Sequence, residues 1–287
     1  MKLSEINKIG VVGAGTMGQG IVISCALAGY QTMIYDIDLN FCDQAILSIH
    51  KSLNKSVEKG KLSTEDCEAA FSRIIKVNEL HGLKAQLVVE AVVENLKVKQ
   101  NLFVELEQIN SGKAILASNT SSISITQIAS VLKNPGNCIG LHFFNPAHLM
   151  KLVEVISGSN TNPEIVSLMK EFSESLGKVS VEVKDSPGFI VNRVARHFYV
   201  ETLKVLEDKV SDHASIDSLM RSAGFKMGPF ELMDLIGIDV NYAVTKSVYE
   251  GFDKAHKFLP SEIQHEKIIA GQLGRKTGKG FYNYEKL

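Results

Sequence analysis

The chain has 287 residues, and its 31 Lys and Arg residues nearly balance its 32 Asp and Glu residues, for a formal net charge of −1. This balance gives no electrostatic basis for binding nucleic acid or a membrane surface, and no apolar run is long enough to cross a bilayer. The length suits two domains, and the four cysteines have no C-x-x-C spacing, so we expect reduced thiols and no metal site.

The first predicted element is a strand over Ile9–Val12, which ends in Gly13-Ala14-Gly15-Thr16-Met17-Gly18. A helical pattern follows, and a second apolar run over Gln31–Tyr35 closes on Asp36. This order of strand, glycine turn, helix, strand and acid is typical of a dinucleotide-binding unit. Because the glycine turn comes so early, we expect no leader peptide and a cytoplasmic protein.

The three glycines have separate predicted roles. Gly13 permits the tight turn, Gly15 lets the backbone approach a pyrophosphate, and Gly18 lets the helix pack closely on the strand. The pyrophosphate would then lie on the N–H groups that begin the helix.

Asp36 indicates which dinucleotide binds. A carboxylate at this strand end accepts hydrogen bonds from the ribose hydroxyls and repels a 2′-phosphate. Residues 37–40 offer no Arg or Lys to hold such a phosphate, so NAD is favoured over NADP.

A helical insertion is predicted over about residues 41–80, with a basic middle. By composition alone its lysines form a solvated helix face. They are Lys51, Lys55, Lys59 and Lys61.

Further apolar runs alternate with helical patterns and predict a doubly wound, mostly parallel α/β sheet of Rossmann type. These runs are Leu87–Ala91, Ala114–Ala117, Cys138–Phe143 and Leu152–Ile156. Beyond Pro187-Gly188 only helical periodicity follows. We therefore expect two domains, residues 1–185 and an all-helical domain of residues 186–287.

His142 and Glu154 are the candidate catalytic pair, because both lie in apolar runs where an unpaired polar group is costly. If their strands are neighbours, Glu154 can fix the tautomer of the imidazole and favour its protonated form. The other ring nitrogen could then act as a base toward an alcohol. A buried histidine with a purely structural ion pair is an equally open interpretation.

Seven sequence blocks carry a resemblance that runs nearly end to end. They are Gly13–Gly18, Val92–Lys99, Ala117–Ser122, His142–Pro146, Lys151–Val155, Asp185–Arg193 and Gly274–Tyr282. On these blocks the chain resembles the L-3-hydroxyacyl-CoA dehydrogenases, in their short bacterial 3-hydroxybutyryl-CoA dehydrogenase form.

The resemblance implies hydride transfer between a (3S)-3-hydroxyacyl-CoA, with 3-hydroxybutanoyl-CoA expected, and NAD. In that family His142 matches the catalytic base and Glu154 its orienting partner. Ser121 and Asn192 match residues that contact the substrate near its reacting carbon.

The resemblance also implies binding residues. The cofactor positions, besides the three glycines, are Asp36, Glu94, Lys99, Ser121, Asn145 and Lys276. Ser52 and Lys59 match the contacts to coenzyme A, whose phosphates would attract cations. Without the family, Glu94 and Lys99 would be interpreted as a helix-start acid and a solvated lysine, Asn145 as a turn residue, and Lys276 as solvent-exposed.

One position departs from the family, in which a proline usually stands where this chain has His148. The histidine adds a titratable group to the loop after His142 and removes a rigid turn. The family further implies a homodimer through the helical domain, with a short-chain acyl-CoA as the substrate.

Two other functions stay open at this point. A dehydrogenase of free hydroxy acids would need a cationic clamp, usually an Arg, for the substrate carboxylate, and none is evident beside the catalytic blocks. A non-catalytic NAD-binding protein could keep the fold, although it would have no use for the His142 and Glu154 pair.

Overall fold

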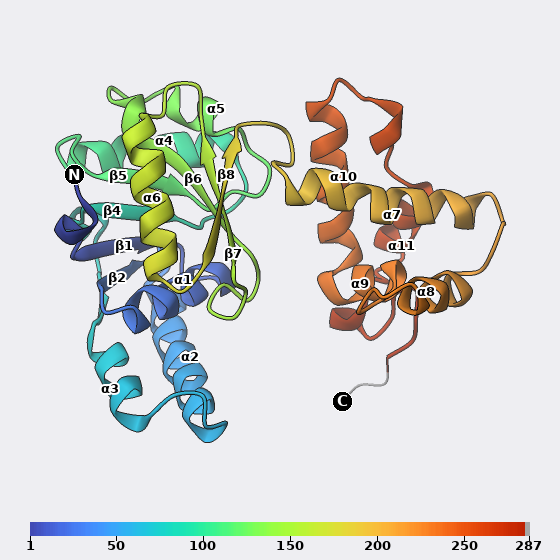
Figure 1. The fold of residues 1–287 in the computed structure, drawn as a ribbon, viewed down its shortest axis with the longest axis horizontal. Coiled ribbons are helices and arrows are strands. Elements are labelled where there is room, and N and C mark those ends of the chain that lie inside the picture. Colours follow the sequence, from blue (N-terminus) through green and yellow to red (C-terminus); the bar gives the residue numbers. More distant parts are fainter. Residues whose placement is uncertain (285–287) are drawn as a thin grey trace. The chain divides into compact units, whose positions relative to one another are not determined.

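The computed structural model describes residues 1–284, and its contacts divide the chain into two units, Met1–Ser186 and Pro187–Leu287. The first unit is an eight-stranded sheet with helices on both faces, and the second is built from helices (Figure 1). The predicted fold class, a Rossmann-like sheet with a helical insertion followed by a helical domain, is confirmed.

The sheet has the strand order β3-β2-β1-β4-β5-β6-β7-β8. All neighbouring strands are parallel except β6 and β7, which are antiparallel. The strands are β1 (Lys8–Val12), β2 (Gln31–Tyr35), β3 (Ile74–Lys76), β4 (Leu87–Glu90), β5 (Ile115–Ser118), β6 (Cys138–Phe143), β7 (Leu152–Ser157) and β8 (Val179–Lys184).

The two edge strands, β3 and β8, are the ones that the apolar runs did not predict. No residue of β3 is buried, and in β8 only Val183 is buried. Edge strands bury little, so they lack the continuous apolar run by which the central strands are recognised.

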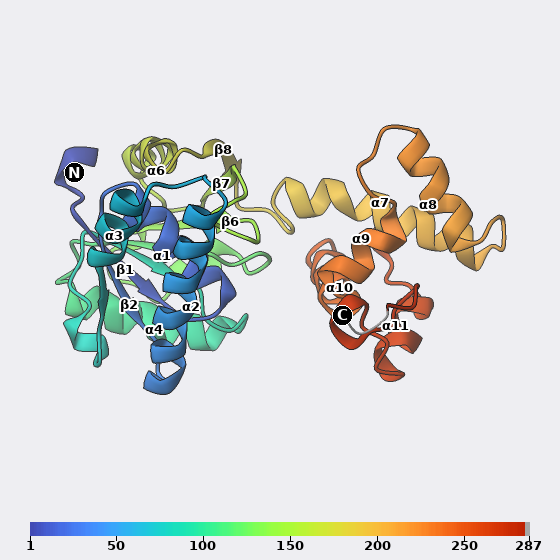
Figure 2. The same cartoon turned by 90° about the horizontal axis from the view of Figure 1, so that it is seen from below.

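Six helices belong to the first unit. They are α1 (Thr16–Leu27), α2 (Leu39–Glu58), α3 (Thr64–Ser72), α4 (Leu96–Ile109), α5 (Ile125–Ala129) and α6 (Pro163–Ser175). Helices α1 and α6 cover one face of the sheet and α4 the other, as Figure 2 shows. Helices α2 and α3 form the predicted insertion and pack on α1, which is therefore buried over most of its length.

Local sequence explains where several of these helices begin. The side chains of Asp38, Ser63, Asn95 and Ser124 each accept a hydrogen bond from a backbone N–H of the first turn. Such caps satisfy N–H groups that have no partner inside the helix.

Within residues 187–284 the second unit has five α-helices around its own core. They are α7 (Val191–Glu207), α8 (His213–Ser222), α9 (Pro229–Ile236), α10 (Ile238–Gly251) and α11 (Glu262–Ile269). The core joins residues of α7, α8 and α9 with Phe281 from the C-terminal segment. Within residues 1–284, no helix has the length and apolar character needed to span a membrane.

Candidate active site

The glycine turn after β1 has the geometry that its sequence predicts. Gly13 has a φ of 104°, and a Cβ there would lie 2.5 Å from the carbonyl oxygen of Ala91. A Cβ on Gly18 would lie 1.8 Å from the carbonyl oxygen of Gly13. A Cβ on Gly15, by contrast, would meet nothing within 4 Å, so the space in front of α1 is open to a ligand.

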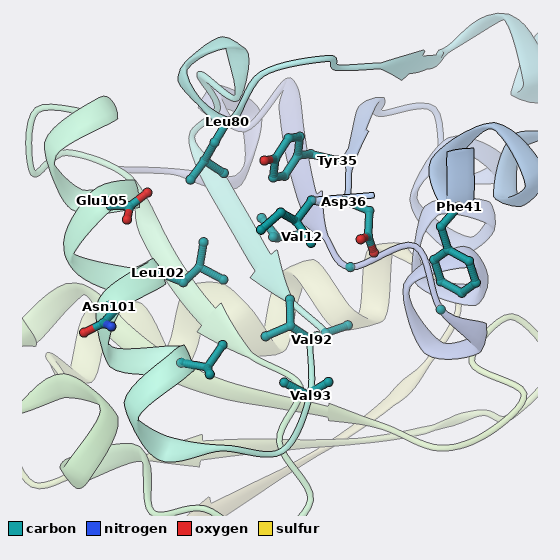
Figure 3. A pocket seen from close by; sticks show the side chains of 15 residues that line it. Val12, Tyr35, Asp36, Phe41, Leu80, Val92, Val93, Asn101, Leu102 and Glu105 are labelled. Atoms are coloured by element: carbon teal, nitrogen blue, oxygen red, sulfur yellow. The ribbon is translucent and has the colours of Figure 1, made fainter. Parts of the chain in front are cut away.

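A cavity of about 510 Å³ opens beside this turn, at the carboxyl ends of β1, β2 and β4 (Figure 3). Its walls are mostly apolar side chains from β1, α2 and α4, together with the loops that follow β2 and β4. Its lining residues are Val12, Gly13, Gly15, Tyr35, Asp36, Ile37, Phe41, Leu80, Ala91, Val92, Val93, Val98, Asn101, Leu102 and Glu105. None of these is a Lys or Arg, and two are acids.

Asp36 lies at the border between this cavity and the glycine turn. Its Oδ2 accepts a hydrogen bond from the backbone N–H of Ala14 at 2.7 Å, and its Oδ1 accepts one from the backbone N–H of Asp38 at 3.1 Å. A carboxylate has about four acceptor positions, so two remain for ribose hydroxyls. Asp36 therefore fits NAD and, because it is an anion, disfavours a 2′-phosphate.

The predicted cofactor residues Glu94 and Lys99 belong to one charge cluster, in which Lys99 is buried and the Glu94 side chain is 38% exposed. The Lys99 side chain is 1% exposed, and its Nζ lies 2.5 Å from Glu90 Oε1 and 3.2 Å from Glu94 Oε2. The interpretation of Lys99 as a solvated lysine was wrong, because Glu90 makes its burial possible. Sequence reasoning missed Glu90, although an acid inside the apolar run of β4 was a visible signal for a buried partner.

Glu94 organises the turn that holds Ser121. Its Oε1 accepts the backbone N–H groups of Ser121 and Ser122 at 3.1 and 3.2 Å, and the hydroxyl groups of Thr120 and Ser122. Although burial opposes ionisation, Lys99 and these hydroxyl donors hold the pKa of Glu94 below its ordinary value. A charged Glu94 thus sets the position of the Ser121 backbone.

His142 and Glu154 face each other across the antiparallel pair β6 and β7. His142 Nδ1 lies 2.7 Å from Glu154 Oε2, and the two residues are 6% and 1% exposed. The end of β6 is also tied to β5, because the N–H of Phe143 donates to Asn119 Oδ1 at 2.9 Å. The Nδ1 side of the imidazole therefore faces the carboxylate, and Nε2 is the ring nitrogen left for other chemistry.

The loop after β6, residues 144–150, is fastened to α1 and to Lys178. It contains the predicted cofactor residue Asn145, which precedes Pro146 in a cis peptide bond. The buried Lys178 donates from Nζ to the carbonyl oxygens of Ala147 and Met150 at 2.7 and 2.9 Å. A Cβ on Gly20 of α1 would lie 2.9 Å from the Cβ of Ala147, so the helix and the loop are in close contact.

His148 lies in this loop, partly buried beside Lys178. Its Nδ1 is buried without a hydrogen-bond partner among the described residues. Burial, and to a lesser degree the charge of Lys178, lowers the pKa of His148 below its ordinary value of 6.5. His148 is therefore neutral at pH 7.

The remaining predicted residues belong to other elements of the chain. Ser52 lies in α2, and the exposed Lys59 is the residue directly after the last turn of that helix. Neither residue lines the cavity. The second unit carries Asn192, in the first turn of α7, and Lys276. Lys276 Nζ forms an ion pair with Asp239 at 2.6 Å, and its side chain is 45% exposed.

The C-terminal block around Lys276 has a structural explanation within the second unit. The buried Asp234 accepts the N–H groups of Phe281 and Tyr282, both at 2.9 Å. A Cβ on Gly280 would lie 2.0 Å from Asp234 Oδ1, and one on Gly274 would lie 2.3 Å from the carbonyl oxygen of Asp234. These glycines are therefore required for packing against Asp234.

Comparison with known proteins shows to which family the chain belongs. Residues 8–186 match the model described as 3-hydroxyacyl-CoA dehydrogenase, NAD binding domain, and residues 188–284 match the 3-hydroxyacyl-CoA dehydrogenase, C-terminal domain. The chain is similar to 3-hydroxyadipyl-CoA dehydrogenase of Escherichia coli, with 48% identity over 282 residues that cover 98% of this chain and 59% of that protein. It is 39% identical over 281 residues to 3-hydroxybutyryl-CoA dehydrogenase of Clostridioides difficile, covering 97% of this chain and 100% of that protein.

Solved structures agree with this result. The crystal structure of (S)-3-hydroxybutyryl-CoA dehydrogenase from Ralstonia eutropha has a TM-score of 0.94 at 37% identity, covering 98% of this chain and 100% of that chain. A crystal structure of 3-hydroxybutyryl-CoA dehydrogenase from Escherichia coli has a TM-score of 0.95 at 47% identity, covering 99% of this chain and 61% of that chain. The chain belongs to the 3-hydroxyacyl-CoA dehydrogenase family, and its first unit is the family's NAD-binding domain.

Proposed function

We propose that the chain interconverts (3S)-3-hydroxyacyl-CoA and 3-oxoacyl-CoA esters with NAD as the hydride carrier. The observation that carries this proposal is the buried pair of His142 and Glu154, 2.7 Å apart on two adjacent strands of the domain that binds NAD. A pair built only for stability would gain little from a buried charge. A base with a fixed orientation, in contrast, needs such a partner.

In the proposed mechanism His142 moves the proton. When the alcohol is oxidised, Nε2 of His142 takes the proton of the 3-hydroxyl group, and Glu154 stabilises the imidazolium through Nδ1. In the reverse direction the imidazolium returns this proton to the 3-oxo group. Ser121 and Asn192 would orient the substrate oxygen, and the hydrogen bonds from Ser121 and Ser122 to Glu94 would hold that turn in place.

The residues present fit NAD. The open space at Gly15 would admit the pyrophosphate, Asp36 would bind the ribose, and the apolar cavity would take the adenine. NAD, when bound, would accept the hydride from C3 of the substrate. Asn145, Lys99 and Lys276 are further proposed cofactor residues. The buried Lys99 forms ion pairs with Glu90 and Glu94.

The substrate class is a short acyl group on coenzyme A. Ser52 and the exposed Lys59 would bind the coenzyme A part, and we infer a homodimer through the helical unit. The names of the relatives specify a butyryl chain for some and an adipyl chain, which ends in a carboxylate, for another. For this chain we propose 3-hydroxybutanoyl-CoA and acetoacetyl-CoA as the simplest substrate pair.

The test is NADH oxidation with acetoacetyl-CoA, run beside NADPH with the same ester and beside NADH with free acetoacetate. We expect fast turnover only with NADH and the CoA ester. Turnover with free acetoacetate would support a dehydrogenase of free acids. Folded protein that binds NADH but turns over no CoA ester would overturn the proposal in favour of a non-catalytic NAD-binding protein.

A further inference from the structure

Glu90, at the carboxyl end of β4, is a fully buried carboxylate that the proposed mechanism does not use. Its Oε1 accepts hydrogen bonds from Lys99 Nζ at 2.5 Å and from the backbone N–H of Val92 at 2.7 Å. Its Oε2 accepts one from Ser118 Oγ at 2.6 Å. One side chain thus joins β4, the loop that follows it, α4 and the end of β5.

A first route leads from Glu90 through Lys99 to Glu94. Lys99 Nζ contacts both carboxylates, at 2.5 and 3.2 Å, and its side chain is 1% exposed. Because Lys99 is the fourth residue of α4, it lies near the end of the helix where the dipole disfavours a cation. The two carboxylates therefore hold the cation there. Oε1 of Glu94 accepts the backbone N–H of Ser121 at 3.1 Å, so this route ends on the turn of residues 120–122.

A second route leads from Glu90 through Ser118 to the same turn. The Ser118 hydroxyl donates to Glu90 and accepts the backbone N–H of Thr120 at 3.2 Å. Ser118 is 0% exposed, so both hydrogen bonds are shielded from solvent. Two separate chains of polar contacts therefore connect one buried carboxylate with the turn that carries the proposed substrate and cofactor residue Ser121.

The alternative role for Glu90 is only to compensate the charge of Lys99. A buried ion pair is a costly way to fill a core, because apolar side chains of similar volume are often as stable or more stable. Compensation alone would also leave the route through Ser118 unexplained. The arrangement instead divides the two oxygens of Glu94, since Oε2 faces Lys99 and Oε1 accepts from the turn.

We propose that Glu90 is a positioning residue of the reaction, which fixes the turn of residues 120–122 so that Ser121 meets the substrate oxygen. This inference rests on the proposed function, in which Ser121 orients that oxygen. Glu90 would act only through its hydrogen-bond partners, because it is fully buried and does not line the cavity. Without the charge of Glu90, Lys99 would be attracted to Glu94 alone and would compete with the turn for that carboxylate.

The test is a double-mutant cycle on kcat for acetoacetyl-CoA reduction at saturating NADH, with the wild type, Glu90→Gln, Ser121→Ala and the double variant. The amide of Glu90→Gln keeps the shape of the side chain and can still accept from Val92, but it carries no charge. We expect Glu90→Gln to lower kcat about tenfold in the wild type and less than about twofold when Ser121 is already replaced. A residue that supports only folding would have the same effect in both backgrounds.

Glu107→Gln is the matched control. Glu107 is another buried carboxylate of α4, and it accepts the backbone N–H groups of Lys133 and Asn134 instead of those of the turn. Its replacement should leave kcat within about twofold of the wild type. The inference fails if Glu107→Gln lowers kcat as much as Glu90→Gln does. It also fails if Glu90→Gln lowers kcat by the same factor in both backgrounds, or not at all.

If Glu90→Gln does not fold, Ser118→Ala takes its place in the cycle, because it breaks the second route and leaves the buried charges intact. A loss of kcat that disappears in the Ser121→Ala background would support the inference. An equal loss in both backgrounds, or no loss, would reject it. Wild-type turnover of acetoacetyl-CoA separates these outcomes from a failure of the proposed function, since that failure would leave the wild type itself inactive.

Discussion

At the scale of single residues, burial decides how His142 and Glu154 can behave. Glu154 is 1% exposed in the middle of β7, so its carboxylate depends on the imidazole opposite for compensation. The same contact leaves Nδ1 committed to the carboxylate and gives Nε2 the catalytic role in our proposal. The same hydrogen bond therefore serves the proposed proton transfer and the stability of the folded protein, so the two effects have to be measured separately.

Replacing Glu154 by Gln should slow the chemical step more than it weakens cofactor binding. The amide keeps the shape of the side chain but no longer stabilises an imidazolium, so kcat should fall by about 10²-fold or more. Steady-state rates with acetoacetyl-CoA, beside NADH titration by fluorescence, measure the two effects. Equal losses in both would assign Glu154 to folding instead.

Asp36 should determine the choice between NADH and NADPH. Asp36→Asn removes the negative charge at the ribose but keeps an oxygen that can accept from Ala14, so NADH affinity should fall about tenfold and NADPH affinity should rise. Glu105→Gln is the matched control, because Glu105 is the other acid that lines the cavity. If both variants change the preference equally, general charge in the cavity, and not a ribose contact, sets the specificity.

At the scale of elements, the site depends on two backbone segments that pack on α1. The glycine turn leads directly into the first residue of α1, and the loop of residues 144–150 contacts α1 at Gly20. Lys178 fastens the loop through the carbonyl oxygens of Ala147 and Met150. Helix α1 therefore connects the proposed pyrophosphate site with the segment that follows the catalytic histidine.

Alanine substitutions at two glycines should separate folding from cofactor binding. Gly18→Ala places a Cβ against the Gly13 carbonyl oxygen and should lower the thermal unfolding midpoint, with NADH binding lost as a consequence. Gly15→Ala puts a Cβ into open space, so the fold should be kept while NADH affinity falls tenfold or more. Thermal unfolding and NADH titration check both variants, and tight NADH binding by Gly15→Ala would contradict the assigned site.

His148 should make the protein less stable in mild acid. Because its pKa in the folded protein lies below the ordinary value of 6.5, the unfolded chain binds the proton more readily. The contribution of neutral His148 to the free energy of unfolding is therefore complete above about pH 6.5, and it is lost as the pH falls toward the pKa of the folded state. Urea unfolding of wild type and His148→Gln, each at about pH 8 and about pH 5.5, measures this effect. Between the two pH values the wild type should lose more unfolding free energy than His148→Gln. A difference between the two proteins that does not change with pH would show that His148 does not titrate.

At the scale of the whole molecule, the sequence predicts the architecture better than the details of the site. The fold class and the pairing of His142 with Glu154 could be predicted because buried strands are continuous apolar runs and polar residues inside them need partners. The edge strands β3 and β8 could not, since exposed strands carry no such pattern. The burial of Lys99 was not predicted, because its ion-pair partner Glu90 lies on a different element of the fold, β4.

The roles of the two units also differ in what the sequence could reveal. The glycines of the C-terminal block carry the family resemblance, yet their steric reason, Asp234, lies about forty residues earlier in the chain. The steric role of Gly274 and Gly280 is therefore visible in the structure, where the sequence shows only their spacing.

The measurement that tests the account most directly is kcat for acetoacetyl-CoA reduction by His142→Gln, with NADH affinity determined on the same protein. If His142 moves the proton, kcat should fall about 10²–10⁴-fold while NADH binds as tightly as it does to the wild type. Turnover close to that of the wild type would contradict the proposed mechanism and would leave the His142 and Glu154 pair as a structural contact.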